Sequence, residues 1–319
     1  MVLDLYITHY KEPWEVCAPG FKMLSVQRCV DWSHVNITVV HDGTPCFPDE
    51  YFKDMPFKIN QVSVPHGGIA AVRNWCIENG EAEWIKWNDV DDTFNNLFAL
   101  HDMMNCLYSA QNFDLLWFDL MWDDRGKVYC RTERDPVFVH NKCFRRSFLK
   151  GHDIRFKEDL IWCEDSAFLA VVEMEINHQR IGKITCKNAI YTYIVRDGSL
   201  CNRPEIHFQN LQSFFKRHCY VADQFLKRGL TKEYNTMCVR VMADSYYTIV
   251  KDPKIQEDRS EFEAEVWAWY EEHKEACRAC TPEDFQFVMR AVKRERFDGG
   301  ESTENEFLQW IYNHERGGF

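Results

Sequence analysis

The segment EWIKWNDVDDTF, residues 83–94, places three carboxylates directly after residues with the bulk and β-propensity of a strand. Asp89, Asp91 and Asp92 are interrupted only by Val90, and like charges this close repel one another unless a cation or hydrogen-bond donors compensate. A single Asp is enough to cap a following helix. Three of them at a strand end indicate a site for a divalent cation, which prefers clustered hard oxygen ligands.

A second acidic pair, Glu164 and Asp165, stands in IWCEDSAFLA at the start of an apolar helical run. Such a pair can cap the helix and stabilise its dipole. It can also supply a general base that takes the proton from an attacking hydroxyl. Trp162, two residues upstream, can stack on a sugar ring or pack in the core, and the sequence leaves both readings open.

Two further segments suit a nucleotide diphosphate. Asp42 follows the strand-like VNITVVH and can accept a hydrogen bond from a uracil N–H or a ribose hydroxyl. Gly67 and Gly68 in HGGIAAVRN precede a helix, where free amides and the helix dipole favour anions, although a plain turn is the alternative. Arg73 on that helix can brace the acidic loop, reach the ligand or remain a surface charge.

Basic residues concentrate in FRRSFLKGHDIRFK, which contains Arg145 and Arg146. Such a segment can follow the phosphates of a nucleic acid, or it can be a solvated helix face or a structural element. The formal net charge of −12 argues against a nucleic-acid or anionic-membrane surface, because such binders present a net basic face.

The elements that must position these residues alternate between strand and helix patterns in the first half of the chain. Strands are expected over residues 2–8, 35–41, 60–64 and 83–88. Helices are expected over 13–32, with an interruption at Pro19 and Gly20, over 68–80 and over about 93–111. This alternation predicts an α/β domain whose sheet has parallel strands and helices on both faces. Ligands bind beyond the carboxyl ends of such strands, where the acidic segment and Asp42 both lie.

From about residue 205 onward the apolar residues follow helical periodicity. The sequence therefore predicts two parts, residues 1–203 and a helical C-terminal subdomain over residues 204–319. Within the second part, Thr281 followed by Pro282 and Asp284 is a helix start signal.

Composition limits the class of protein further. Of 319 residues, 45% are apolar and 15% aromatic, enough for a folded core. The 14 Cys are scattered without a disulfide pattern, which fits a reducing cytosol and a cytoplasmic protein. CRAC, with Cys277 and Cys280, resembles half of a zinc knuckle but lacks a second ligand pair. No segment has the pattern of a signal peptide or a membrane span.

The order of these segments resembles that of inverting family-2 glycosyltransferases of the GT-A fold, a Rossmann-like fold for nucleotide-diphospho-sugar transferases. The resemblance covers roughly residues 2–200. The segments that carry it are YITHYKEPW, VVHDGT, HGGIAAVRN, WNDVDDTF, VHNKCFRRSFLKGHDIRF, WCEDSAF and YTYIVRDGSL. As a compact transferase of this type, the chain also resembles glycosyltransferases that bacteriophages encode.

The resemblance implies a role for each acidic residue. Asp91 would ligate Mn²⁺ or Mg²⁺ at the donor diphosphate, and Asp89 would contact the ribose or share in the metal site. Asp165, with Glu164 beside it, would be the catalytic base.

For the donor nucleotide, the resemblance implies that Asp42 reads the uracil of a UDP-sugar and that Thr8 and Tyr10 line the base pocket. Gly68 and Arg73 belong to the same donor-binding set. The sequence departs from the family pattern at His9 and Lys11 around Tyr10, at His41 before Asp42, and at Val72 before Arg73.

The resemblance therefore implies a metal-dependent, inverting hexosyltransferase that moves a sugar from a nucleotide-sugar to an acceptor hydroxyl of a glycan or wall polymer. One alternative is a phage-type enzyme that glycosylates a hydroxymethylated base in DNA. Another, of a different class, is a non-catalytic nucleotide-sugar-binding protein. A nucleotidyltransferase is disfavoured because THYKEPWEV lacks the glycines of a phosphate loop.

Overall fold

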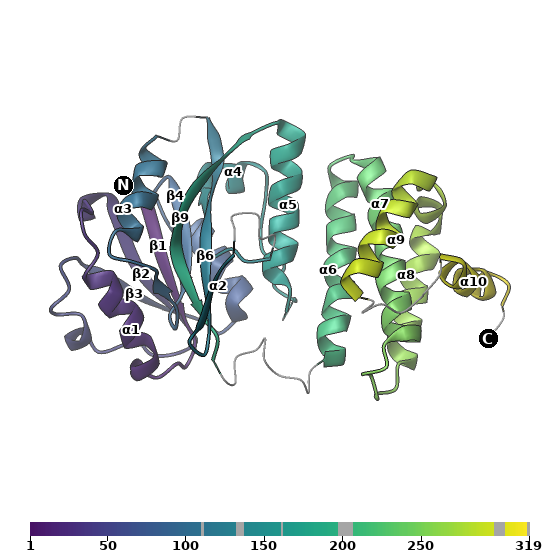
Figure 1. The fold of residues 1–319 in the computed structure, drawn as a ribbon, viewed down its shortest axis with the longest axis horizontal. Coiled ribbons are helices and arrows are strands. Elements are labelled where there is room, and N and C mark those ends of the chain that lie inside the picture. Colours follow the sequence, from purple (N-terminus) through teal and green to yellow (C-terminus); the bar gives the residue numbers. More distant parts are fainter. Residues whose placement is uncertain (110–111, 132–136, 161, 197–206, 297–303, 318–319) are drawn as a thin grey trace. The chain divides into compact units, whose positions relative to one another are not determined.

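The computed structural model describes residues 1–109, 112–131, 137–160, 162–196, 207–296 and 304–317. The chain divides into two compact units, Met1–Arg203 and Pro204–Phe319 (Figure 1). The segment that joins them lies outside the described residues, as does Ser199 of the YTYIVRDGSL segment. Each unit is described by itself.

The N-terminal unit is built on one mixed sheet with the strand order β3-β2-β1-β4-β8-β6-β9-β5, and β7 pairs with β6. The strands are β1 Leu3–His9, β2 Val35–Asp42, β3 Ile59–Val64, β4 Trp84–Asp89, β5 Thr93–Phe94, β6 Phe113–Asp124, β7 Lys127–Arg131, β8 Lys142–Arg145 and β9 Gly182–Ile194. Strands β3, β2, β1 and β4 are parallel, as the alternating pattern predicts. Strand β8 is antiparallel to both β4 and β6, while β6 and β9 are parallel.

Helices cover both faces of this sheet, again as predicted. The helices are α1 Trp14–Ser25, α2 Gly68–Glu78, α3 Ala99–Tyr108, α4 Arg146–Gly151 and α5 Glu164–Gln179, with short 3₁₀ turns at Trp32–His34 and Asp49–Tyr51. Trp84 packs in the hydrophobic cluster that contains residues of α1 and α3. Trp87 contacts the rings of Phe156 and of Phe168, which belongs to α5. Positions 84 and 87 point to opposite faces because side chains alternate along a strand.

The parallel register gathers the predicted site residues at one edge of the sheet. Thr8 on β1 pairs with Val40 on β2 and with Asp89 on β4, and Asp42 ends β2. The carboxyl ends of these strands therefore meet at a single edge, where ligands bind in open α/β sheets.

Two local expectations are wrong. Helix α1 is not interrupted at Pro19, because Cys17, Phe21 and Leu24 anchor one helical face in the core, but it ends at Ser25 and does not reach residue 32. The helix expected from about residue 93 begins only at α3, since Thr93 and Phe94 form β5 and pair with β9. That pairing joins residues about a hundred positions apart, so no local pattern reports it.

Helices make up the C-terminal unit: α6 His207–Lys227, α7 Thr231–Tyr246, α8 Ser260–Arg278, α9 Pro282–Arg296 and α10 Glu304–Glu315, with a π-helical turn over Tyr247–Lys251. They enclose a separate core that includes Phe215, Met242 and Trp267. Helix α9 starts where predicted: the Thr281 hydroxyl donates to the Asp284 carboxylate at 2.7 Å and accepts from its amide at 3.2 Å. Within the described residues, no helix has the length and apolar content needed to cross a membrane.

Candidate active site

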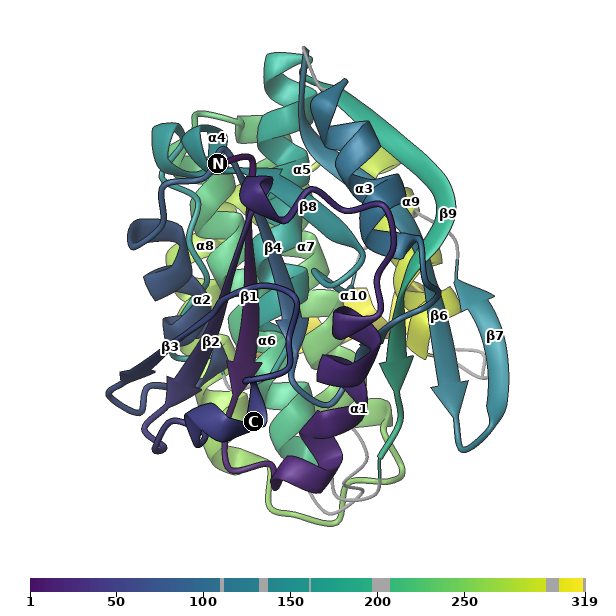
Figure 2. The same ribbon diagram turned by 90° about the vertical axis from the view of Figure 1, so that its left-hand side faces the viewer.

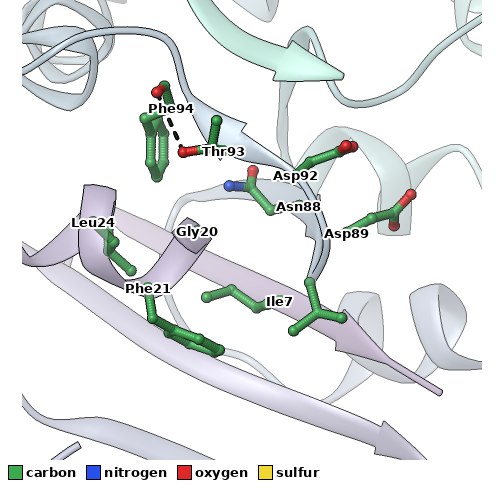
Figure 3. Close-up of a pocket in the computed structure, with 10 residues that line it drawn as sticks. Ile7, Gly20, Phe21, Leu24, Asn88, Asp89, Asp92, Thr93 and Phe94 are labelled. Atoms are coloured by element: carbon green, nitrogen blue, oxygen red, sulfur yellow. Dashed lines mark hydrogen bonds between the residues drawn. The ribbon is translucent and has the colours of Figure 1, made fainter. Parts of the chain in front are cut away.

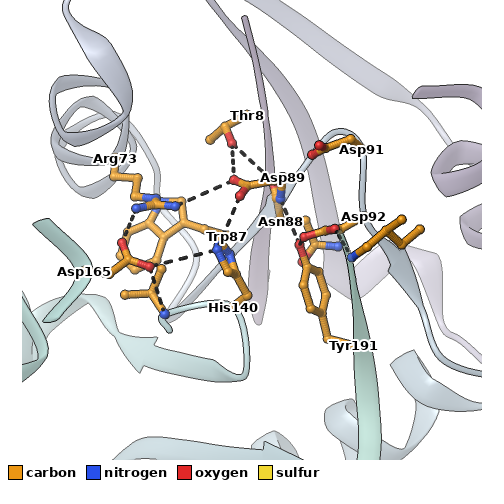
Figure 4. A network of polar contacts seen from close by, with 12 residues as sticks. Thr8, Arg73, Trp87, Asn88, Asp89, Asp91, Asp92, His140, Asp165 and Tyr191 are labelled. Atoms are coloured by element: carbon orange, nitrogen blue, oxygen red, sulfur yellow. Dashed lines mark hydrogen bonds and ion pairs between the residues drawn. The ribbon is translucent and has the colours of Figure 1, made fainter. Parts of the chain in front are cut away.

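Asp89, the last residue of β4, is held by groups from three other parts of the N-terminal unit (Figure 4). The Thr8 hydroxyl donates to its carboxylate at 2.8 Å, the Arg73 guanidinium lies at 3.6 Å, and His140 Nε2 lies at 3.3 Å. Burial by itself would raise the pKa of Asp89, but His140 and Arg73 outweigh it and the pKa is lowered. Asp89 is therefore ionised and oriented.

Asp92 is turned inward and ties the acidic loop to β9. It is 4% exposed, the Tyr191 hydroxyl donates to it at 2.6 Å, and the Ile194 amide donates to it at 2.8 Å. Burial raises the pKa of Asp92 well above its usual value, and Asp91 and Asp89 raise it further. This residue shapes the loop and is not available to a ligand.

Asp91 is the carboxylate of the loop that faces outward, with 18% of its side chain exposed. It forms an ion pair and a hydrogen bond with Arg196, which follows β9. Burial and the charge of Asp89 raise the pKa of Asp91, and Arg196 acts in the opposite direction. A cation thus already neutralises this carboxylate.

The residues fit a divalent metal held jointly with a diphosphate. In the described part of the chain, no group of three His, Cys, Asp or Glu side chains is arranged to hold a metal by itself. Mg²⁺ does not need such a cage, because it is commonly bound by one or two carboxylates together with substrate phosphates. Asp91, partly exposed beside Asp89, would supply that donor set in exchange for its ion pair with Arg196.

Beneath the loop lies a fully buried lysine that the sequence analysis did not identify. Lys86 Nζ donates to Asn88 Oδ1 at 2.6 Å and to the Trp87 carbonyl at 2.7 Å, and it stands 4.4 Å from the centre of the Tyr191 ring. Burial lowers the pKa of Lys86 to about 7. Its position in the middle of a strand of large apolar residues is the one signal of this burial in the sequence.

Asp165, the predicted base, lies in the same network at the first turn of α5. It pairs with Arg73, accepts a hydrogen bond from the Val139 amide at 3.2 Å, and lies 3.9 Å from His140 Nε2. Arg73 and His140 contact Asp89 as well as Asp165, so two acidic segments 76 positions apart in the sequence share their partners.

Glu164 accepts from Arg73 at 3.1 Å and keeps 15% of its side chain exposed. Burial, followed by the charge of Asp165, raises the pKa of Glu164 to about 8. The folded structure therefore favours the protonated form of Glu164 more than water does.

Arg73 is the cation that joins the two acidic sets. Its side chain is 2% exposed, and it pairs with Asp89, Glu164 and Asp165. Burial would lower the pKa of Arg73, but these three carboxylates raise it. Of the predicted roles for Arg73, the structure shows the one that braces the acidic loop.

On the donor side, Asp42 is buried and its hydrogen bonds are internal. The amides of Gly67 and Gly68 donate to it at 2.8 and 3.1 Å, and His66 Nδ1 lies 2.9 Å from it. These amides are therefore not free for an anion, in contrast to the expectation. Gly68 adopts φ +82°, which favours glycine at this turn.

Tyr10, beyond the end of β1, is 41% exposed and stacks on His66 with ring centres 4.7 Å apart and planes at 8°. Thr8 is buried and its hydroxyl is used by Asp89. The exposed side chains beyond the end of β1 are thus the stacked rings of Tyr10 and His66, and Asp42 orients the His66 ring.

The two adjacent arginines of the basic segment are structural. Arg146 is buried, bonds Asp4 at 2.5 Å and donates to the carbonyls of Cys76 and Ala82. Arg145 pairs with Glu83 and Asp114, and its guanidinium lies 4.6 Å from the centre of the Trp84 ring. These two side chains do not form an exposed surface that could follow phosphates. Trp162 is half-buried, just before α5.

One small cavity adjoins the acidic loop, between α1 and the ends of β1 and β4 (Figure 3). Its volume is about 10 Å³, room for about one water molecule. Gly20 of α1 lines it, and a Cβ there would stand 2.5 Å from the Asp92 carbonyl oxygen. The helix therefore approaches the loop closely because residue 20 has no side chain.

The fold defined by this sheet, its helices and the acidic edge is that of GT-A glycosyltransferases. Among solved structures, the chain is similar to TarS of S. aureus. It matches TarS 1-349 in complex with UDP at a TM-score of 0.52 and 14% identity, and TarS 1-349 in complex with UDP-GlcNAc at 0.52 and 15%, over 95% of each chain in both cases. A further TarS structure matches at 0.51 and 16% over 95% of this chain, which spans 57% of that one.

Because the sequence identities to TarS are this low, the structural similarity shows a shared fold and no more. No model of a protein family matches the sequence, and no curated protein matches it.

Proposed function

We propose that the chain is a metal-dependent, inverting glycosyltransferase of family 2 that transfers a sugar from a nucleotide-sugar to an acceptor hydroxyl. The observation that carries the proposal is the shared network: Arg73 and His140 both contact Asp89 of the acidic loop and Asp165 of the second acidic pair. A donor-binding carboxylate and a candidate base thus border one site at the carboxyl edge of the sheet.

In the proposed reaction Asp165 accepts the proton of the acceptor hydroxyl as its oxygen attacks the anomeric carbon. Direct displacement from the opposite side inverts the configuration at that carbon. Asp91, with Asp89, would hold Mn²⁺ or Mg²⁺, and when bound the ion offsets the negative charge that develops on the leaving diphosphate. Arg73 and the Val139 amide keep Asp165 oriented throughout.

For the donor we propose a UDP-sugar. TarS, whose fold this chain shares, has been solved with UDP and with UDP-GlcNAc. Tyr10 and His66 offer a flat aromatic surface for a nucleobase, and Asp42 acts by orienting His66 and the glycine turn. Thr8 acts on the donor through Asp89, whose carboxylate it holds.

For the acceptor we propose a hydroxyl of a glycan or wall polymer. The DNA alternative depended on the basic segment, and Arg145 and Arg146 are engaged in internal ion pairs. A non-catalytic binder would not need Asp165, whose burial beside Arg73 carries a desolvation cost.

The test is donor hydrolysis without an acceptor, measured for a panel of UDP-, GDP-, CDP- and dTDP-sugars with and without Mn²⁺. We expect slow release of UDP from one or more UDP-sugars, dependent on Mn²⁺ and lost in Asp91→Asn. Hydrolysis that is unchanged by chelation of the metal would overturn metal dependence. Failure of every nucleotide-sugar to bind or hydrolyse would overturn the transferase proposal.

A further inference from the structure

Four aromatic side chains form a continuous cluster beside the proposed active site, on the hairpin of β6 and β7, on β9 and in the segment before β8. We name it the aromatic platform, and its members are Trp122, Tyr129, Phe138 and Tyr193. The Trp122 ring centre lies 4.6 Å from that of Tyr193, 5.5 Å from that of Phe138 and 6.1 Å from that of Tyr129. Phe138 and Tyr193 are 5.6 Å apart.

Strand register explains why the rings of Trp122, Tyr129 and Tyr193 share a face. Trp122 is the cross-strand partner of both Tyr193 on β9 and Tyr129 on β7. Partners opposite one another in a sheet project to the same side. Tyr191, two positions before Tyr193 on β9, projects to that side as well, and its hydroxyl donates to Asp92 of the acidic loop.

The platform continues directly into the catalytic network. Phe138 precedes Val139, whose amide donates to Asp165, and the Phe138 ring lies 6.3 Å from that of His140. Trp122 and Tyr193 lie near the carboxyl ends of β6 and β9, which point to the same edge as the carboxyl end of β1 (Figure 2). The platform therefore starts next to Asp165, the proposed general base, and extends away from it.

The platform is also accessible. Tyr129 is 45% exposed, and Trp122, Phe138 and Tyr193 are half-buried. On the opposite face of the same hairpin strand, Val128 is 54% exposed, so solvent reaches both sides of β7.

We propose that the aromatic platform binds pyranose rings of an acceptor glycan, and this inference rests on the proposed glycosyltransferase function. A pyranose presents C–H groups on its faces and hydroxyls around its rim, so its face packs on an aromatic ring while its hydroxyls stay hydrated or reach polar groups. A sugar held on Trp122 and Phe138 directs a neighbouring hydroxyl toward Asp165. The substrate class is a saccharide chain longer than one unit.

A glycan suits this site better than a nucleic acid, although nucleobases also stack on aromatic rings. Asp165, the proposed base, adjoins the platform, because it accepts a hydrogen bond from the amide of Val139, the residue after Phe138. The chain carries a net charge of −12, which repels a phosphate backbone. A neutral saccharide meets no such repulsion.

The experiment measures binding to an array of immobilised pyranose oligosaccharides in the presence of UDP and Mn²⁺. We compare the wild type with Trp122→Leu, which removes the indole face, and with Tyr129→Ala. Trp122→Phe is the conservative variant, and Val128→Ala is the matched control on the other face of the hairpin. Thermal unfolding of each variant reports any loss of folding, and because Tyr129 is exposed, Tyr129→Ala decides the matter if Trp122→Leu fails to fold.

The wild type is expected to bind one or more oligosaccharides, Trp122→Leu and Tyr129→Ala to bind them at least tenfold more weakly, and Trp122→Phe and Val128→Ala to bind them normally. No glycan binding by the wild type, undiminished binding by both platform variants, or binding only to duplex DNA containing a hydroxymethylated base would each overturn the inference. Donor hydrolysis by the wild type separately reports the proposed function, so the two failures are distinguishable.

Discussion

At the scale of single residues, the site is organised by the cations that compensate its acidic groups. Arg73 meets Asp89 and Asp165, Arg196 meets Asp91, and Lys86 lies beneath the loop. An isolated buried carboxylate would be strongly unfavourable, so each of these pairings is a condition for the loop to fold as it does.

Replacing Asp165 by Asn tests the assignment of the base. Asparagine keeps the size of the side chain but cannot accept the proton, so transfer should fall by about 10²- to 10⁴-fold, the usual contribution of a general base. Binding of UDP with Mn²⁺, measured by calorimetry, should persist. Asp159→Asn is the matched control, since that side chain is 66% exposed. Transfer at the wild-type rate in Asp165→Asn would remove Asp165 from the mechanism.

Glu164 should make the stability of the protein depend on pH. Its pKa is raised from 4.5 to about 8 in the folded state, so between these values the folded chain binds more protons than the unfolded one. Stability should therefore decrease as pH rises from about 5 to 8, by at most about 1.4 kcal/mol per pH unit.

Urea unfolding at several pH values measures this effect. Glu164→Gln should be less sensitive to pH over that window, whereas the exposed control Glu272→Gln should behave as the wild type. An identical slope in Glu164→Gln and the wild type would contradict the assignment.

Arg196 should compete with a metal for Asp91, because a guanidinium and a divalent cation cannot occupy the same carboxylate oxygens. In Arg196→Gln we expect Mn²⁺ to bind about fivefold more tightly in the absence of donor, equivalent to about 1 kcal/mol for a partly exposed ion pair. Electron paramagnetic resonance of free Mn²⁺ measures the affinity. Arg290→Gln, an exposed change in the C-terminal unit, is the control, and weaker Mn²⁺ binding by Arg196→Gln would refute the competition.

At the scale of elements, the acidic loop is fixed by three neighbours that come from distant parts of the sequence. Thr8 on β1 holds Asp89, Tyr191 on β9 holds Asp92, and Gly20 lets α1 approach the loop backbone. The loop keeps its shape because all three elements pack around it.

Gly20→Ala should separate α1 from the loop. The added Cβ would lie 2.5 Å from the Asp92 carbonyl oxygen, so we expect a loss of about 1–3 kcal/mol in the free energy of unfolding. Gly151→Ala is the matched control, because nothing lies within 4 Å of its added Cβ at the end of α4. Urea unfolding compares the two, and equal stability of Gly20→Ala and the wild type would show that the helix can shift without cost.

The same elements show where local sequence patterns are informative. The strands that become β1, β2 and β4 were predicted because runs of apolar residues end at polar groups. The short β5 was missed, since its two residues form a strand only by pairing with β9. The antiparallel β8 was not foreseen, because which strands pair depends on contacts between distant segments.

At the scale of the whole molecule, each unit contains its own hydrophobic core. The core of the C-terminal unit includes Phe215, Met242, Trp267 and Trp310, all from helices of that unit. The predicted acidic sets and donor-side residues all belong to the N-terminal unit.

Residues 204–319 expressed alone should therefore fold into a helical domain with a cooperative thermal transition, and residues 1–203 alone should still bind UDP with Mn²⁺. Circular dichroism and calorimetry measure these outcomes. The sequence 204–319 in which Trp267 is replaced by Asp should lose the transition, which controls for residual helix without a core. A fragment 204–319 that stays unfolded would show that this unit depends on the rest of the chain.

The sequence alone determined which groups of this protein could do chemistry, because carboxylates at a strand end and at a helix start can be recognised from residue type and spacing. It did not identify His140, Tyr191 or Arg196 as site residues, although they lie in segments that carry the resemblance. It did not identify Lys86 either, whose one signal is its place in an apolar strand. Only the tertiary structure decided that Asp92 points inward, that Asp42 holds a turn and that Arg145 and Arg146 are internal. The physical reason is that burial and charge pairing are set by segments far apart in the chain, which meet only when the sheet has formed.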